Sequence, residues 1–213
     1  MDQTTENVQK SYDLVADEYT AHIADELEHK PLDRDLLRRF VRQTRGSGQV
    51  CDLGCGPGHV TSYLHEQRAA VLGIDLSARM VELARQHHPD IEFQQGNMAA
   101  LTDIQDASWA GIVAFYSLIH FERPQLPAVL QELYRVLQPD GLLLLAFHEG
   151  QEVRHFDEWW NHPVSLNFNF FERTEIEHYL NTAGFTIEES LTRSPYDNVE
   201  VQTQRSYIIA RKP

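Results

Sequence analysis

Short β-rich runs alternate with helical patterns through the middle of the chain, and this alternation restricts the fold more than any other feature. The β-rich runs cover residues 49–53, 69–75, 91–95, 111–117 and 141–147, and the helical patterns between them cover residues 59–67, 77–88 and 125–137. This order predicts βαβ units with a parallel sheet. The run GLLLLAF at 141–147 supports this prediction, because parallel strands buried on both faces are continuously apolar.

The C-terminal part departs from the alternation. Two β-rich runs, at about 185–192 and 204–211, follow one another with no helical pattern between them. Consecutive strands can pair antiparallel as a hairpin, so the parallel sheet is expected to end in an antiparallel strand. A chain of 213 residues is long enough for one α/β domain with a substantial core. We therefore predict a single domain over residues 1–213.

The N-terminal part reads as two helices. Residues 11–29 place apolar and aromatic side chains at helical spacing, and the opposite face is acidic. Pro31 is expected to end this helix. Tyr12 and Tyr19 are seven positions apart and so share one face of it. A second amphipathic helix follows, before the loop RGSG at 45–48.

Three glycines, Gly54, Gly56 and Gly58, directly follow the first β-rich run in the sequence GCGPGH. In a parallel sheet, ligands bind outside the carboxyl ends of the strands, which is where this loop lies. A dinucleotide fingerprint needs a third glycine at the sixth position, but this chain has His59 there. A phosphate-binding P-loop needs Lys-Ser or Lys-Thr after its glycines, and neither is present.

Acidic residues end the first two strands. Asp52 suits a ligand with a cationic group and repels phosphate, and S-adenosylmethionine carries an ammonium and a sulfonium but no phosphate. Asp75 can accept hydrogen bonds from both hydroxyls of a ribose. Leu76 and Met80 are placed to pack on an adenine, and the Asn97 amide to contact its edge. The alternatives are a helix cap for Asp52, core packing for Leu76 and Met80, and a turn for Asn97.

In their order and spacing, seven short segments resemble those of the class I S-adenosylmethionine-dependent methyltransferases of the small single-domain type. They are YDLVADEY, VCDLGCGPG, VLGIDLSARMVELAR, FQQGNMAAL, SLIHF, LYRVLQPDGLLLLAF and NTAGFTI, and they cover the chain from about residue 10 onward. The resemblance implies a Rossmann-like, doubly wound α/β fold with seven strands in the order 3-2-1-4-5-7-6 and strand 7 antiparallel. It also implies S-adenosylmethionine as cofactor and S-adenosylhomocysteine as product.

The resemblance extends to further parts of the predicted site. It implies that the N-terminal helices, residues 1–45, form a lid over the methionine end of the cofactor, with Tyr12 and Tyr19 near the sulfonium. The alternative is an amphipathic helix that only packs on the domain. We also predict cofactor contacts from Met98, Tyr116 and Ser117.

Methyl transfer is an in-line displacement on a carbon that the sulfonium activates, so the enzyme must chiefly align the acceptor. A base is needed only where the acceptor carries a proton. His120, just past the fourth strand, is the first candidate base, and His148, at the end of the fifth, is the second. His120 can instead be a substrate contact, and the chain holds 11 histidines, most of which must be ordinary.

The segment 148–171 is rich in aromatic residues. Leu166, Phe168 and Phe170 alternate with polar Asn167 and Asn169, which predicts an extended stretch. We interpret 148–171 as an aromatic cap over the substrate pocket. The alternative is a strand that covers the core or forms a dimer contact.

Composition excludes several classes of partner. The formal net charge of -14 argues against nucleic acid and against an anionic membrane surface. No apolar run approaches the about 20 residues that span a bilayer, and the polar, acidic N-terminus does not resemble a secretory signal. Cys51 and Cys55 are the only cysteines and suggest neither a disulfide framework nor a zinc site. We expect a cytoplasmic monomer or homodimer without a metal.

The sequence thus predicts methyl transfer from S-adenosylmethionine to an oxygen, nitrogen or carbon atom of a small organic molecule. Two alternatives are a non-catalytic protein that binds S-adenosylmethionine or S-adenosylhomocysteine, and a nicotinamide-dependent oxidoreductase. His59 in place of the third glycine and the acid at Asp52 argue against the oxidoreductase.

Overall fold

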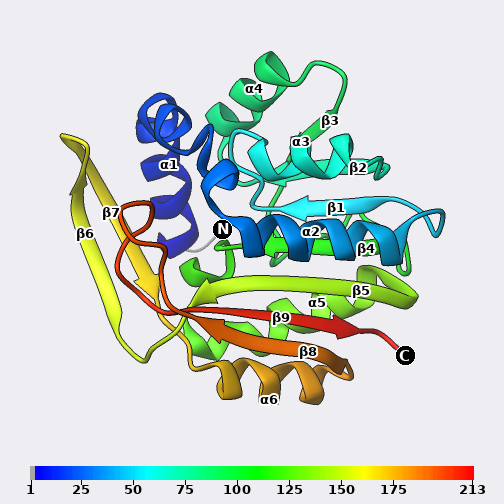
Figure 1. Cartoon of the computed structure of the whole chain (residues 1–213). Coiled ribbons are helices and arrows are strands. Elements are labelled where there is room, and N and C mark those ends of the chain that lie inside the picture. Colours follow the sequence, from blue (N-terminus) through cyan, green and yellow to red (C-terminus); the bar gives the residue numbers. More distant parts are fainter. Residues whose placement is uncertain (1–2) are drawn as a thin grey trace.

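A computed structural model of the chain describes residues 3–213 and contains a central seven-stranded sheet (Figure 1). The strands are β1 (Val50–Leu53), β2 (Val71–Asp75), β3 (Glu92–Gln95), β4 (Trp109–Phe115), β5 (Leu137–His148), β8 (Thr186–Arg193) and β9 (Arg205–Arg211). Their order is β3-β2-β1-β4-β5-β9-β8; β9 runs antiparallel to β5 and β8, and the other neighbouring strands pair parallel. Counted within this sheet, the order is 3-2-1-4-5-7-6, which confirms the predicted Rossmann-like topology.

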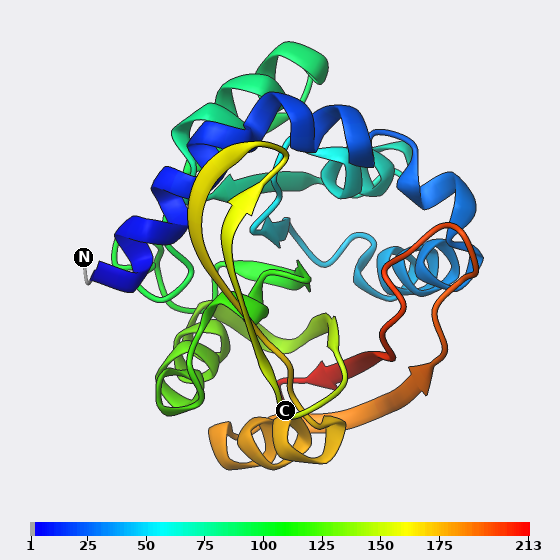
Figure 2. The same ribbon diagram turned by 90° about the vertical axis from the view of Figure 1, so that its left-hand side faces the viewer.

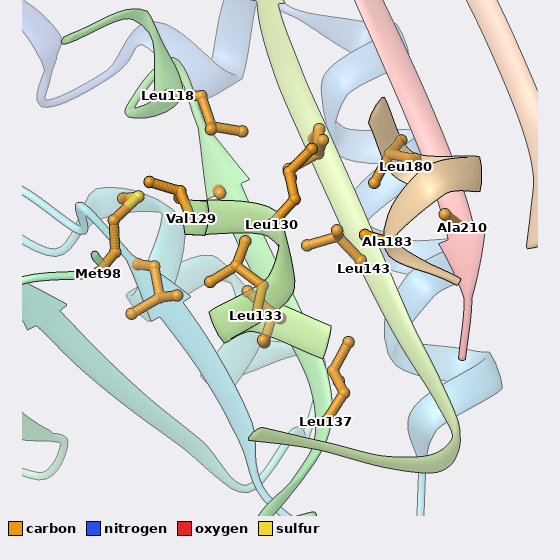
Figure 3. Close-up of a cluster of buried hydrophobic side chains, with 14 of the residues drawn as sticks. Met98, Leu118, Val129, Leu130, Leu133, Leu137, Leu143, Leu180, Ala183 and Ala210 are labelled. Atoms are coloured by element: carbon orange, nitrogen blue, oxygen red, sulfur yellow. The ribbon is translucent and has the colours of Figure 1, made fainter. Parts of the chain in front are cut away.

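Helices cover both faces of the sheet. The α-helices are α1 (Gln3–Ile23), α2 (Pro31–Thr44), α3 (His59–Glu66), α4 (Ala78–His87), α5 (Leu126–Val136) and α6 (Arg173–Ala183), and the 3-10 helices are η1 (Glu26–His29), η2 (Leu118–His120) and η3 (Arg123–Gln125). Apolar residues of α2 and α3 pack on one face, and those of α5 and α6 pack on the other. Figure 3 shows the second cluster, in which Leu130 and Leu133 of α5 meet Leu143 of β5.

Strand β5 explains why the run GLLLLAF is continuously apolar. Leu142 and Leu144 point to the face that α2 covers, whereas Leu143 and Leu145 point to the face that α5 covers. All four side chains are at most 1% exposed. Each fully buried leucine contributes about 1.5–3 kcal/mol, so a polar residue on either side of this strand would be costly.

The predicted boundaries of the first helix were wrong. Helix α1 begins at Gln3 and ends at Ile23, and the short η1 turn (Glu26–His29) separates it from α2. Pro31 does not end a helix but begins α2. Its fixed φ and missing N–H are tolerated in the first turn, where that N–H would have no intrahelical partner.

Residues 153–169 form a separate two-stranded hairpin of β6 (Val153–Trp159) and β7 (His162–Asn169). The hairpin stands beside α1, outside the central sheet (Figure 2). Trp160 and Asn161 turn the chain with φ of 49° and 63°, as a tight hairpin turn requires. The sequence predicted an extended stretch at 166–170 but not β6, because most β6 side chains are exposed and show no apolar alternation. None of the helices within residues 3–213 is long and apolar enough to cross a membrane.

Candidate active site

The glycine loop after β1 is held against the end of β2 by backbone hydrogen bonds. The N–H groups of Gly54 and Cys55 both donate to the carbonyl oxygen of Ile74, at 2.8 and 3.1 Å. Gly54 has a φ of 75°, and a Cβ added there would lie 2.3 Å from the Cβ of Ser117. Ser117 is itself fixed, since its Oγ donates to the carbonyl of Leu53 at 2.8 Å. Only glycine fits at this point, where the loop meets the end of β4.

Asp75, the last residue of β2, is tied to the same loop. Its Oδ2 accepts the N–H of Gly56 and its Oδ1 accepts the N–H of Ser77, both at 2.8 Å. Burial raises the pKa of Asp75 to about 6, although these N–H groups favour the charged form. The carboxylate is thereby fixed in one orientation and keeps lone pairs for a ligand.

A first cavity, with about 730 Å³ of space including its open mouth, lies beside Asp75. Every predicted cofactor-binding residue except two lies on its wall: Tyr12, Tyr19, Gly54, Gly56, Asp75, Leu76, Met80, Asn97, Met98, Tyr116 and Ser117. His120 lies on the same wall. Residues from five separate stretches of the chain therefore meet around one space.

A second cavity, with about 1270 Å³ of space including its open mouth, adjoins the first. The two share Tyr12, Tyr19, Gly54, Gly56, Phe115 and Tyr116. His148, Trp159 and Phe168 lie on the wall of the second cavity but not on that of the first. Tyr116, at the boundary, has a φ of 55°, which is rare for a non-glycine residue. Such strained residues are found where a site imposes the conformation.

The two exceptions are Asp52 and Gly58. Asp52 lies in the wall of the second cavity, where the hydroxyl of Thr61 donates to it at 2.6 Å and burial raises its pKa to about 6. Gly58 borders neither cavity. With a φ of 89° it is the N-cap of α3, and an added Cβ would lie 2.8 Å from the Phe93 ring. Gly58 therefore allows the start of α3 to approach Phe93 of β3 closely.

Three other predicted residues also make contacts within the protein. Asn97 accepts the N–H of Ala99 on its Oδ1 at 2.9 Å, which is a turn contact. Met80 is 1% exposed and packs with Ala16 of α1, so it is core as well as cavity wall. Leu76 is only partly buried, beside the hairpin and α1.

Comparison with known proteins agrees with this geometry. Residues 50–141 match the family model described as methyltransferase domain. The structure also resembles magnesium protoporphyrin IX methyltransferase (ChlM) from Synechocystis PCC 6803 with bound SAM, with a TM-score of 0.76 at 17% identity over 100% of this chain and 99% of that one. Residues 50–141 are therefore similar to a methyltransferase domain, and the chain has the Rossmann-like fold seen in such enzymes.

Two curated relatives match part of this chain. Trans-aconitate 2-methyltransferase from Azoarcus sp. (strain BH72) is 35% identical over 127 residues, which are 59% of this chain and 46% of the relative. Malonyl-[acyl-carrier protein] O-methyltransferase from Enterobacter lignolyticus (strain SCF1) is 30% identical over 156 residues, 72% of this chain and 58% of the relative. The matched segments thus span about half the length of these relatives.

His120 lies at the first cavity with Tyr12. Its Nε2 and the Tyr12 hydroxyl are 2.9 Å apart. Its Nδ1 is buried and has no hydrogen-bond partner among residues 3–213. Burial lowers the pKa of His120 to about 4, so the ring is neutral at pH 7. The ring also packs edge-on against Phe168 of β7, with centroids 5.3 Å apart. His120 therefore connects α1 to the hairpin.

His148 lies apart from His120, in the second cavity. Its Nδ1 is 2.9 Å from the Thr203 hydroxyl, and its ring stacks on Phe170. Burial, followed by the positive charge of Arg205 and other cations, lowers the pKa of His148 to about 4. Both candidate bases are therefore neutral at pH 7, and each binds a proton only weakly.

Sequence reasoning missed an ionic network in the second cavity. Lys30 pairs with Glu26 at 2.8 Å and with Glu200 at 3.5 Å, and Arg205 pairs with Glu200 at 3.0 Å. Although burial opposes it, hydrogen bonding from Arg193 and the nearby cations lower the pKa of Glu200 to about 2. The available signal was Arg205 itself, a charged residue at the start of the buried strand β9. Across the described part of the chain, no three His, Cys, Asp or Glu side chains are grouped as metal ligands.

Proposed function

We propose that this chain binds S-adenosylmethionine in the first cavity and transfers its methyl group to a small organic acceptor in the second. The observation that carries the proposal is the shared boundary of the two cavities, formed by Gly54, Gly56, Phe115 and Tyr116 with Tyr12 and Tyr19. A ligand held in one cavity can therefore present its reactive end to the other. Methyl transfer requires this end-to-end arrangement of donor and acceptor.

In this proposal the strand ends hold the cofactor. Asp75 binds the ribose hydroxyls, Leu76 and Met80 pack on the adenine, and the glycine loop accommodates the methionine end. Asn97, Met98 and Ser117 complete the adenosine side of the cavity. Asp52 acts from behind the loop, as a negative charge near the ammonium group.

The N-terminal helices and the segment 148–171 close the site in this proposal. Tyr12 and Tyr19 of α1 face both cavities, which supports residues 1–45 as a lid. An aromatic ring near the sulfonium contributes about 0.5–2 kcal/mol. Trp159 and Phe168 of the hairpin line the second cavity, which supports 148–171 as an aromatic cap over the acceptor.

The transfer itself breaks the bond between sulfur and methyl as the acceptor atom bonds to the methyl carbon. The electron pair of the broken bond stays on sulfur, which leaves S-adenosylhomocysteine. Alignment of donor and acceptor supplies up to about 7–11 kcal/mol. Neither His120 nor His148, each with a pKa of about 4, is a strong base. We therefore infer that the acceptor atom, whether oxygen, nitrogen or carbon, reacts in an already unprotonated form.

Two measurements on the full chain test this function. Calorimetric titration should show binding of S-adenosylmethionine and S-adenosylhomocysteine but not of NADH. A screen of small acceptors with methyl-labelled S-adenosylmethionine should then give a labelled product. Binding of NADH alone would exclude the proposal, and tight cofactor binding with no product from a broad screen would favour a non-catalytic binding protein.

A further inference from the structure

Strand β6 presents an unpaired backbone edge to the outside. One edge of the β6–β7 hairpin is covered, because the Ser165 N–H of β7 donates to Ser11 Oγ of α1 at 3.0 Å and the Asn169 amide donates to the Ile119 carbonyl at 3.0 Å. The other edge is that of β6, which pairs with β7 and with no further strand of residues 3–213. Figure 1 shows β6 as the outermost strand. Such an edge is a template for another strand.

The β6 edge is also regular. Its register with β7 shifts between Phe156 and Glu158, which pair with Leu166 and Pro163. Three steps on β7 therefore oppose two on β6, so the extra residue of the bulge lies in β7. A bulge on β6 would have bent its outer edge away from a partner. Because the bulge lies on the inner strand, the backbone of β6 stays continuous.

Strand β6 carries basic side chains before its central residue, Phe156, and acidic side chains after it. Arg154 and His155 precede Phe156, whereas Asp157 and Glu158 follow it. When two such strands pair antiparallel about Phe156, Arg154 lies opposite Glu158 of the second copy, and His155 lies opposite Asp157. In-register parallel pairing would instead place Arg154 opposite Arg154. Opposite charges facing each other stabilise a strand pair, and like charges destabilise it.

We propose that the chain forms a symmetric homodimer through antiparallel pairing of β6 with β6 of a second copy. Two-fold symmetry places the same patch on both subunits, as a self-complementary strand allows. The side chains of Arg154 and Asp157 are exposed, at 43% and 92%, although Arg154 also pairs with Glu152 at 2.9 Å and Asp157 with His155 at 3.0 Å. Val153, at 52% exposure one of the few exposed large apolar residues, would lie opposite the half-buried Trp159.

The dimer would also bear on the site. Trp159 of β6 and Phe168 of β7 line the second cavity, so pairing would hold the cavity wall in place. This consequence rests on the proposed function, but the dimer does not. The molecular mass in solution tests the proposed dimer, whereas titration with the cofactor tests the proposed binding site. One proposal can therefore fail while the other holds.

Charge-reversal variants of the full chain test the proposal, with their oligomeric state measured by sedimentation velocity at low ionic strength. Arg154→Glu leaves acidic side chains at both positions, and Glu158→Arg leaves basic ones, so each variant alone should raise the dimer dissociation constant by about tenfold or more. Mixing the two variants pairs acidic with basic edges and should restore the dimer. The double variant R154E/E158R is again self-complementary and should dimerise like the wild type.

Arg42→Glu is the matched control, because Arg42 is exposed in the last turn of α2 and its change alters net charge by the same amount. This variant should dimerise normally. Circular dichroism checks that each variant folds. A monomeric wild-type chain at all concentrations would overturn the proposal. So would single variants that dimerise like the wild type, or variants that fail to recover the dimer when mixed.

Discussion

The two halves of the first cavity are built differently. Backbone hydrogen bonds to Gly54 and Asp75 hold the half formed by the strand ends. Side-chain packing holds the half formed by α1, where the Tyr12 and Tyr19 rings lie 5.7 Å apart and Tyr19 packs on Trp159 of the hairpin behind it, with centroids 5.7 Å apart. The strand-end half leaves no room for an added Cβ at Gly54, whereas a ring contact survives a change that keeps the ring. The strand-end half should therefore reject any added atom, and the helical half should tolerate conservative changes.

The sharpest test of this difference is Gly54→Ala. The added Cβ would lie 2.3 Å from that of Ser117, on a backbone with φ of 75°. We expect a loss of about 3 kcal/mol or more in the free energy of unfolding, together with loss of S-adenosylhomocysteine binding. Gly46→Ala is the control, since Gly46 has a φ of 79° but no described atom within 4 Å of an added Cβ. It should lose only about 1 kcal/mol. Equal losses by urea denaturation would show that the loop is not tightly held.

Asp52→Asn tests the electrostatic cost of the strand-end half. The pKa of Asp52 rises from 3.8 to about 6 on folding because of burial, so ionisation destabilises the fold progressively as pH rises from about 4 to about 6. The variant lacks this penalty and can still accept the Thr61 hydroxyl. Its free energy of unfolding, relative to wild type, should therefore rise by up to about 3 kcal/mol over that window and stay level above it. A difference that does not change with pH would contradict the shifted pKa.

Asp75→Asn tests the binding role of the same half. An amide offers one oxygen where the carboxylate accepts two N–H groups, so its NH₂ would face the N–H of Gly56 or Ser77. We expect affinity for S-adenosylhomocysteine to fall about 10- to 100-fold in calorimetry, the cost of losing hydrogen bonds to a charged group. Asp90→Asn, at an exposed position, should bind normally. Unchanged affinity would remove Asp75 from the proposed site.

The smallest effect is expected from Tyr12→Phe in the helical half. The change removes the hydroxyl that lies 2.9 Å from His120 but keeps the ring. We expect a loss of about 0.5–1.5 kcal/mol in stability and little change in cofactor affinity. Tyr63→Phe, which loses a hydroxyl bonded to the Arg34 carbonyl away from this cavity, is the comparison. A Tyr12→Phe defect as large as that of Gly54→Ala would mean that both halves are equally intolerant.

The same contrast explains what the sequence could predict. The strand-end residues follow apolar runs at fixed spacing, so Gly54 and Asp75 were placed by local pattern alone. The ionic network of Lys30 and Glu200 joins residues far apart in the chain, and no local pattern encodes it. Strand β6 escaped prediction because it has no buried face to impose alternation. Pro31 was misread because proline both ends helices and begins them.

The boundary at Tyr116 has one more consequence under the proposed function. Donor and acceptor meet only there, and few side chains belong to both cavities. Residues deeper in the second cavity, such as His148 and Arg205, can change without touching the nucleoside side. Under the proposed function, substitutions in the wall of the second cavity could therefore change the acceptor while the residues that hold the methyl donor stay the same.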